Sequence, residues 1–185
     1  MVVIRLRMFQ ESICLIIMGD KMANMYLICG ISGSGKTTYA KKLAQEENLI
    51  RLDIDEFYEK VNGDECNREN KFEVWIEFFK AIHELEESET DCIVETAGLT
   101  AYQRREFVEW FPKFNHHLIF IDSDKLTRRK NNKSRRRQVP KWRMKQMERI
   151  VEKPNLEGDD KLFNSVHIIK NSFNTFHNVS YTFNF

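Results

Sequence analysis

The segment from Gly30 to Thr37, which reads G-I-S-G-S-G-K-T, constrains the fold of this chain more than any other. It fits the pattern G-x-x-x-x-G-K-[ST], in which a glycine-rich turn joins a buried strand to a helix. Glycine permits φ values that other residues avoid, so the backbone N–H groups can point inward at an anion. The apolar run Met25–Cys29 before it and the helical pattern from Lys36 to Glu47 after it supply the strand and the helix. The segment therefore predicts a phosphate-binding loop.

A loop of this kind predicts a nucleotide site with defined contacts. The ammonium group of Lys36 is expected to reach the β and γ phosphates of ATP, and the hydroxyl of Thr37 is expected to ligate Mg²⁺. The helix that starts near Lys36 adds its positive N-terminal end to the same place. The residues predicted to bind ATP in this segment are Gly30, Ile31, Ser32, Gly33, Ser34, Gly35, Lys36, Thr37 and Thr38.

Strand-like apolar runs alternate with helical patterns along the chain, which is typical of a parallel α/β sheet. We therefore expect the three-layer fold of a kinase-type P-loop NTPase, with a parallel five-stranded sheet and a basic lid. The helical pattern between Glu69 and Glu87 carries an aromatic stripe that we expect to pack on the sheet. The five expected strands are Met25–Cys29, Leu49–Leu52, Asp91–Glu95, His117–Ile121 and Val166–Ile169.

Length and composition favour one soluble globular domain, because the 185 residues are 42% hydrophobic and 31% charged. We expect the kinase domain to span residues 25–170, with residues 1–24 as an N-terminal extension outside the core and residues 171–185 as a tail without a clear structural signal. The unbroken apolar run Ile13–Met18 is too short for a membrane span, so no membrane partner and a cytoplasmic location are expected. The four cysteines lack CxxC spacing, which argues against a metal site or disulfide framework built on them.

Three carboxylates follow predicted strands and are candidates for the chemistry of phosphoryl transfer. Asp53 and Asp55 end the second strand, where one of them could bind an acceptor hydroxyl, and we assign Asp55 as the base. The other interpretation is that these acids cap the helix that begins at Glu56. Glu95 ends the third strand and is expected either to hold Mg²⁺ through water or to orient the substrate. Its alternative is a solvated acid at a strand end.

The segment from Lys125 to Lys153 contains thirteen Lys or Arg residues against two acids, a local balance of +11 in a chain whose net charge is +1. Such a block is either a solvated face or a surface that handles phosphates. It shows no apolar periodicity over its first part, so we expect a surface loop or lid at about residues 128–140.

The acids and basic residues around the loop resemble the phage-type polynucleotide kinase family and its small AAA-like P-loop kinase relatives. The resemblance rests on Gly30–Thr38, on L-D-I-D ending at Asp55, on V-E-T followed by Arg104 and Arg105, and on the basic run ending in V-P at Pro140. It implies that Asp55 activates an acceptor 5′-hydroxyl. Asp53 and Glu95 are further candidates for binding substrate. Arg104 is another, because it and Arg105 begin a helix on the ligand side, although paired basic residues on a helix are more often simply exposed. Tyr58 and the sequence E-T-A-G at Glu95–Gly98 depart from the family pattern.

The same resemblance implies that arginines from the lid close over the transferring phosphate. Arg135 is our candidate for the catalytic arginine, and Arg128 is expected to contact ATP. Three functions then compete: a polynucleotide 5′-hydroxyl kinase, a kinase for a nucleoside, nucleotide or other small metabolite, and an ATP-binding module without an acceptor. The chain lacks the N-K-x-D motif that reads guanine, which argues against a G-protein switch.

Overall fold

The computed structural model describes residues 22–63, 67, 69–135, 138–155, 157–173 and 175–182. Residues 1–21 of the expected N-terminal extension and residues 183–185 of the expected tail lie outside this description. In chain order the elements are β1 (Asn24–Cys29), α2 (Lys36–Glu47), β2 (Ile50–Asp53), α3 (Ile54–Asn62), α4 (Lys71–Glu87), β3 (Cys92–Glu95), α5 (Ala101–Trp110), β4 (Asn115–Ser123), α6 (Lys125–Ser134), α7 (Lys141–Ile150), the short 3₁₀ helix η1 (Asp159–Leu162), β5 (Ser165–Ser172) and β6 (Thr175–Thr182).

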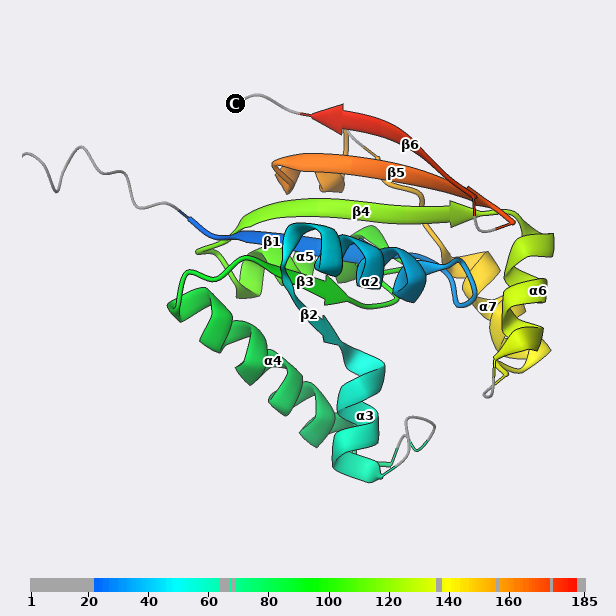
Figure 1. Ribbon diagram of the computed structural model, residues 1–185, viewed down its shortest axis with the longest axis horizontal. Coiled ribbons are helices and arrows are strands. Elements are labelled where there is room, and N and C mark those ends of the chain that lie inside the picture. Colours follow the sequence, from blue (N-terminus) through cyan, green and yellow to red (C-terminus); the bar gives the residue numbers. More distant parts are fainter. Residues whose placement is uncertain are drawn as a thin grey trace, which may run out of the picture.

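The described strands form one six-stranded sheet in the order β2-β3-β1-β4-β5-β6 (Figure 1). β1 pairs in parallel with β3 and β4, and β2 and β5 extend the parallel sheet on either side. Because the parallel strands share one direction, the residues that follow β1, β2, β3 and β4 gather at the carboxyl edge of the sheet. This edge carries the candidate site.

Helices cover both faces of the sheet, as expected for a three-layer α/β fold (Figure 1). Successive residues of β1 point to opposite faces. Leu27 belongs to a core with Phe78 of α4 and Phe107 of α5, whereas Ile28 packs with Ala40 of α2 on the other face. Trp75 and Phe79 of the predicted aromatic stripe thus pack against this core, whereas Phe72 at the N-terminal end of the stripe is 81% exposed.

The strand count differs from the prediction of five. The sixth strand, β6, comes from the segment that gave no structural signal and runs antiparallel to β5. A strand at the edge of a sheet is held largely by backbone hydrogen bonds to its single neighbour, so it does not need the continuous apolar run of a buried strand. Phe176 is the exception, because its ring packs edge-on against Tyr39 of α2.

The basic segment also differs from the expected surface loop, because most of it is helical. Asp124 caps α6 by accepting a hydrogen bond from the backbone N–H of Thr127 at 2.8 Å. Lys and Arg are good helix formers, and among the residues of α6 only Thr127 is fully buried. A helix this exposed leaves no apolar periodicity to detect. Among the described residues, the structure contains no helix that is long and apolar enough to span a membrane.

Candidate functional site

The backbone of Gly30–Thr37 turns tightly between β1 and α2. Gly30 and Gly33 have φ values of 144° and 81°. A Cβ atom added at Gly30 would lie 2.7 Å from the carbonyl oxygen of Ile121, and one added at Gly33 would lie 2.7 Å from that of Arg128. Glycine is therefore required at both positions for conformation and for space. Such a turn directs successive N–H groups into one concavity, which is the geometry of an anion-binding loop.

Lys36 folds back over this loop. Its ammonium group donates to the carbonyl oxygens of Gly30 at 2.8 Å and Ile31 at 3.3 Å. Burial lowers the pKa of Lys36, and the negative charge of Glu95 opposes that shift. The charges of Arg135 and Asp55 also act on the Lys36 ammonium, the first lowering and the second raising its pKa. Charged groups from three separate segments of the chain therefore act electrostatically on Lys36.

Two asparagines brace the outside of the loop, and no role was predicted for either of them from the sequence. The side-chain amide of Asn131 donates to the carbonyl of Gly33 at 2.9 Å, and that of Asn171 donates to the carbonyl of Ser34 at 2.6 Å. Asn131 lies on α6 and Asn171 on β5, far from the loop in the chain. With its carbonyls held from outside, the loop is fixed in shape before any ligand arrives.

Thr37 and Glu95 meet beside the loop. The Thr37 hydroxyl donates to a carboxylate oxygen of Glu95 at 2.5 Å, and Glu95 is only 3% exposed. Burial raises the pKa of Glu95, and the nearby charge of Asp53 raises it further. A hydroxyl and a buried carboxylate in contact are oxygen ligands of the type that Mg²⁺ prefers.

Arg51 on β2 is a residue that the sequence interpretation missed. Its guanidinium lies 2.9 Å from carboxylate oxygens of both Asp53 and Glu95, and it also pairs with Glu56. Because residues two apart on a strand face the same side, Arg51 could have been placed beside Asp53 from the sequence. Its link to Glu95 follows only from the parallel pairing of β2 with β3.

Asp53 and Asp55 have different positions. Asp53 is buried and caps α3, accepting a hydrogen bond from the backbone N–H of Asp55 at 3.0 Å. For Asp53, the structure therefore agrees with the alternative interpretation, in which this acid caps a helix. Asp55 lies in the first turn of α3, is partly exposed, and is close enough to act electrostatically on Lys36.

The two candidate lid arginines lie at opposite ends of α6. Arg135 is exposed at the C-terminal end of the helix, and its charge acts on Lys36. Arg128 is nearly buried near the start, where its guanidinium lies 2.8 Å from Glu148 and donates to the carbonyl of Ser123. The remaining candidate nucleotide contact, Thr38, is exposed in the first turn of α2.

Arg104 requires a correction, because it was expected to bind substrate. Its side chain is fully buried and forms a two-pronged ion pair with Asp160, with distances of 2.7 and 2.8 Å. It also donates to the backbone carbonyls of Gly98 at 3.2 Å and Glu152 at 3.0 Å. These bonds tie α5 to the segment before β5, so the role of Arg104 is structural. The pattern of paired basic residues misled because charge alone does not reveal burial.

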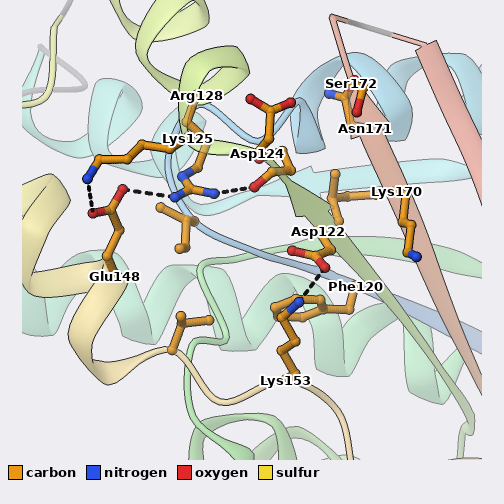
Figure 2. Close-up of a pocket in the computed structure, with 14 residues that line it drawn as sticks. Phe120, Asp122, Asp124, Lys125, Arg128, Glu148, Lys153, Lys170, Asn171 and Ser172 are labelled. Atoms are coloured by element: carbon orange, nitrogen blue, oxygen red, sulfur yellow. Dashed lines mark hydrogen bonds and ion pairs between the residues drawn. The ribbon is translucent and has the colours of Figure 1, made fainter.

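A cavity of about 610 Å³ lies beside the loop, between α6, α7 and the ends of β4 and β5 (Figure 2). Arg128 and Asn171, which both contact the loop, belong to its lining, together with Ile31 of the loop itself. Its charges are largely matched, since Lys153 lies 2.6 Å from Asp122 and Arg128 pairs with Glu148. The cavity is thus adjacent to the loop but distinct from the cluster around Lys36.

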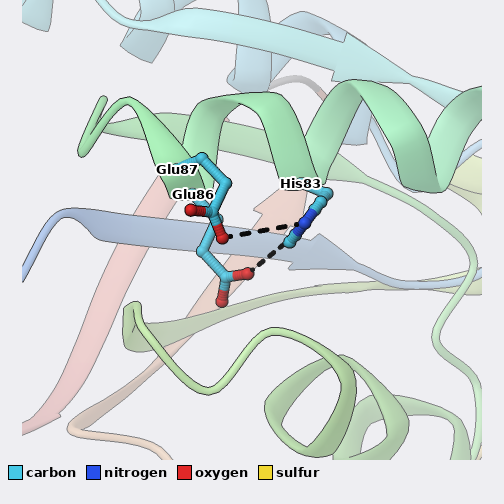
Figure 3. Close-up of side chains that lie close together, drawn as sticks. All are labelled: His83, Glu86 and Glu87. Carbon is cyan, nitrogen blue, oxygen red and sulfur yellow. Dashed lines mark hydrogen bonds and ion pairs between the residues drawn. The ribbon is translucent and has the colours of Figure 1, made fainter.

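A second group of titratable side chains, His83, Glu86 and Glu87, lies near the C-terminal end of α4 (Figure 3). Because α4 leads into β3, this group is at the amino edge of the sheet, opposite the phosphate loop. Lys113 donates to Glu86 through its backbone N–H at 2.9 Å and to Glu87 through its ammonium at 2.7 Å. The two carboxylates therefore anchor the segment before β4.

Comparison with solved structures identifies proteins of similar fold. A sugar kinase from Janibacter sp. HTCC2649 superposes with a TM-score of 0.60 at 17% identity, covering 80% of this chain and 85% of that one. Kti12 from Chaetomium thermophilum, solved with ADP-AlF3, gives 0.59 at 13% identity, covering 79% of this chain and 88% of that one. A chain of the Pnkp1/Rnl/Hen1 RNA repair complex gives 0.63 at 15% identity, covering 70% of this chain and 44% of that one. Identities this low show a shared fold and not a shared substrate.

Comparison of the sequence with known families assigns the chain to one of them. A search of the curated proteins finds none that matches. The model of an AAA domain family matches residues 25–154, from β1 to just beyond α7. That range contains the phosphate loop, the acids that follow β2 and β3, and the basic helices. The chain therefore belongs to this AAA domain family and has a P-loop kinase-like fold, which implies nucleotide binding.

Proposed function

We propose that this protein transfers the γ-phosphoryl group of ATP to a hydroxyl acceptor, with the 5′-hydroxyl end of a polynucleotide as the acceptor. The observation that supports transfer most directly is the geometry of the loop, where Lys36 folds back onto the Gly30 carbonyl at 2.8 Å and the Thr37 hydroxyl contacts the buried Glu95 carboxylate at 2.5 Å. In-line phosphoryl transfer also needs a carboxylate and an arginine near this lysine, and the charges of Asp55 and Arg135 both act on it.

The proposal assigns a role to each of these side chains. The loop amides and Lys36 bind the phosphates of ATP, and Arg128 and Thr38 contact the nucleotide beside them. Asp55 accepts the proton of the acceptor hydroxyl as that oxygen attacks. Arg135 stabilises negative charge on the phosphoryl group during transfer. Asp53 and Glu95, both buried at the ends of neighbouring strands, hold the substrate side of the site in position.

The residues present fit a magnesium ion beside the loop. The Thr37 hydroxyl and the Glu95 carboxylate are already in contact at 2.5 Å, so both are directed to one place. Mg²⁺ bound there would neutralise charge on the β and γ phosphates. Arg51 pairs with the other carboxylate oxygen of Glu95 at 2.9 Å, so it keeps this buried carboxylate in place while the first oxygen faces Thr37.

A small-molecule hydroxyl is the second candidate acceptor. Its support is that the sugar kinase from Janibacter sp. HTCC2649 shares this fold over most of both chains. The polynucleotide is preferred because the α6–α7 segment adjoining the site is strongly basic and exposed, which suits an extended polyanion.

The acceptor is tested by incubating the protein with ATP labelled on the γ-phosphate, Mg²⁺ and a panel of acceptors. The panel contains single-stranded oligonucleotides with 5′-hydroxyl ends, nucleosides, nucleoside monophosphates and simple sugars. The proposal predicts label on the 5′-hydroxyl oligonucleotides and none on matched 5′-phosphorylated ones. Label on a sugar or nucleoside alone would select the second candidate, and ATP binding without transfer to any acceptor would contradict both.

A further inference from the structure

The helices α6 and α7 present a surface whose charges are not balanced by neighbours. Among the described residues this surface, here called the lid surface, consists of Trp142 and the exposed cations Lys125, Arg129, Lys130, Lys133, Arg135, Lys141, Arg143, Lys145 and Arg149. Lys125 lies 3.9 Å from Glu148, and none of the other eight forms an ion pair with a described carboxylate. The lid surface therefore has a net positive charge that is free to bind a negatively charged partner from solution.

Trp142 is unusual in being large, aromatic and 67% exposed in the middle of these charges. On a helix, residues three and seven positions apart lie on one face, so Trp142 is aligned with Lys145 and Arg149. Met144 and Met147 of the same helix point the other way, into a small core with Ile31 and Leu99. The burial of that face fixes α7 and leaves Trp142 displayed outward.

Two sets of contacts join α6 to the start of α7. Asn132 of α6 accepts from the backbone N–H of Val139 at 2.8 Å and donates to its carbonyl at 2.9 Å. The ion pair between Arg128 and Glu148 joins the helices a second time. Binding on such a surface loses little conformational entropy in the protein.

The lid surface begins at the candidate transfer site. Arg135, at the C-terminal end of α6, acts electrostatically on Lys36, and α6 packs on the phosphate loop through Asn131. Figure 1 shows α6 and α7 side by side at the same edge of the sheet as α3, which carries Asp55. A long acceptor whose end reaches Asp55 can therefore continue over α6 and α7.

We propose that the lid surface binds a single-stranded polynucleotide, with Trp142 stacking on a base and the exposed cations contacting the phosphates. Aromatic side chains among cations are the usual means of binding single strands without sequence preference. A membrane surface fits less well, because the exposed side chains of α6 and α7 are mainly cationic, with Leu126, Trp142 and Ile150 as the exposed large apolar residues among them. The inference rests on the proposed function in that the bound strand would carry the acceptor hydroxyl.

The test is equilibrium binding of the full chain to fluorescent single-stranded DNA and RNA that carry 5′-phosphates, without ATP. Trp142→Ala is expected to weaken binding about 5- to 150-fold, the range for losing one stacked base. If about five phosphates are contacted, affinity should fall about 100-fold between 50 and 200 mM salt. Lys145→Glu combined with Arg149→Glu should weaken binding and reduce this salt dependence.

The matched controls are Phe72→Ala, an exposed aromatic of α4 that is 81% accessible, and Lys42→Glu on α2. Both should bind as the wild type does. The proposal is overturned if the wild type binds neither strand at 50 mM salt, if the lid variants bind no worse than the controls, or if phosphatidylserine vesicles displace the strand by binding the same residues.

Strand binding and phosphoryl transfer can fail separately. Trp142-dependent binding without transfer to 5′-hydroxyl ends would support the lid surface and contradict the proposed acceptor. Transfer to 5′-hydroxyl ends that is unaffected by Trp142→Ala and by the two charge reversals, measured below saturation, would support the proposed acceptor and overturn the lid surface.

Discussion

The charges at the phosphate-loop edge and the charges of the lid surface are held in opposite ways. Arg51 at the edge contacts two carboxylates at 2.9 Å each, and Arg104 nearby is completely buried against Asp160. On the lid surface, by contrast, cations such as Arg143 and Arg149 are exposed and form no ion pair with described residues. Similar side chains therefore serve different ends: each enclosed charge fixes the geometry of its own partners, whereas the exposed charges act through their sum.

Substitution of Arg135 is expected to have the largest effect, because this residue belongs to the lid surface and its charge also acts on Lys36. Arg135→Ala should lower the single-turnover transfer rate by about 10³- to 10⁵-fold, as expected when an arginine that stabilises the transferring phosphoryl group is lost. Lys133→Ala, an exposed cation on the same helix, is the control and should change the rate little. Equal effects of the two variants would mean that Arg135 is one more surface charge.

Substitution of Asp55 tests its assignment as the base at the phosphate-loop edge of the sheet. Asp55→Asn keeps the size of the side chain but removes its ability to accept a proton, so transfer should fall by about 10²- to 10⁴-fold while ATP affinity is kept. Transfer rates and nucleotide binding are measured on the same preparation. Glu59→Gln, an exposed acid one turn further along α3, should behave as the wild type does. Full activity of the Asp55→Asn protein would show that another group is the base.

Arg104 tests whether an enclosed charge serves stability instead of chemistry. Arg104→Met leaves Asp160 buried without its partner, which should lower the free energy of unfolding by about 3–5 kcal/mol in denaturant titrations. Arg105→Met removes a partly exposed pair with Glu109 and should cost about 1 kcal/mol or less. Adding Asp160→Leu to Arg104→Met should recover part of the loss. A stable Arg104→Met protein with impaired substrate binding would restore the role that sequence suggested.

Among the substitutions considered, that of Arg51 is expected to have the smallest effect on transfer. Removing a partner that orients a metal-binding carboxylate usually lowers metal affinity or activity about 10- to 100-fold. Arg51→Gln should therefore raise the Mg²⁺ concentration needed for half-maximal transfer, and excess Mg²⁺ should restore much of the rate. Arg143→Gln is the control from the lid surface. An unchanged Mg²⁺ requirement would mean that Arg51 only stabilises the start of α3.

The sequence was sufficient for the parts of the molecule that obey local rules. Short, mostly apolar runs predicted the five parallel strands, and the glycine pattern predicted the loop between β1 and α2. The direction of parallel strands also predicted that Asp53 would lie at the ligand edge of the sheet, whereas its position beside Glu95 emerged only from the pairing of β2 with β3. These features depend on neighbouring residues and on one general property of parallel sheets.

The remaining features depend on contacts between distant segments. Asn171 reaches Ser34 across 137 positions of the chain, and β6 is defined only by its pairing with β5. The burial of Arg104 depends on Asp160, 56 residues away. Such pairings leave no periodic signal in the sequence. A charged residue also looks the same in the sequence whether its side chain is exposed or enclosed. The lid was misjudged for a related reason, because an exposed helix such as α6 has no apolar stripe.

Binding of Mg²⁺-ATP to the purified full chain, measured by titration calorimetry, tests whether the Gly30–Thr37 loop is a nucleotide site. We expect one nucleotide per chain with an affinity that falls when Mg²⁺ is removed, and a loss of binding in Lys36→Ala but not in Lys41→Ala, an exposed lysine on the same helix α2. Failure of the wild-type protein to bind ATP in the presence of Mg²⁺, or binding that survives the loss of Lys36 unchanged, would contradict this assignment of the loop.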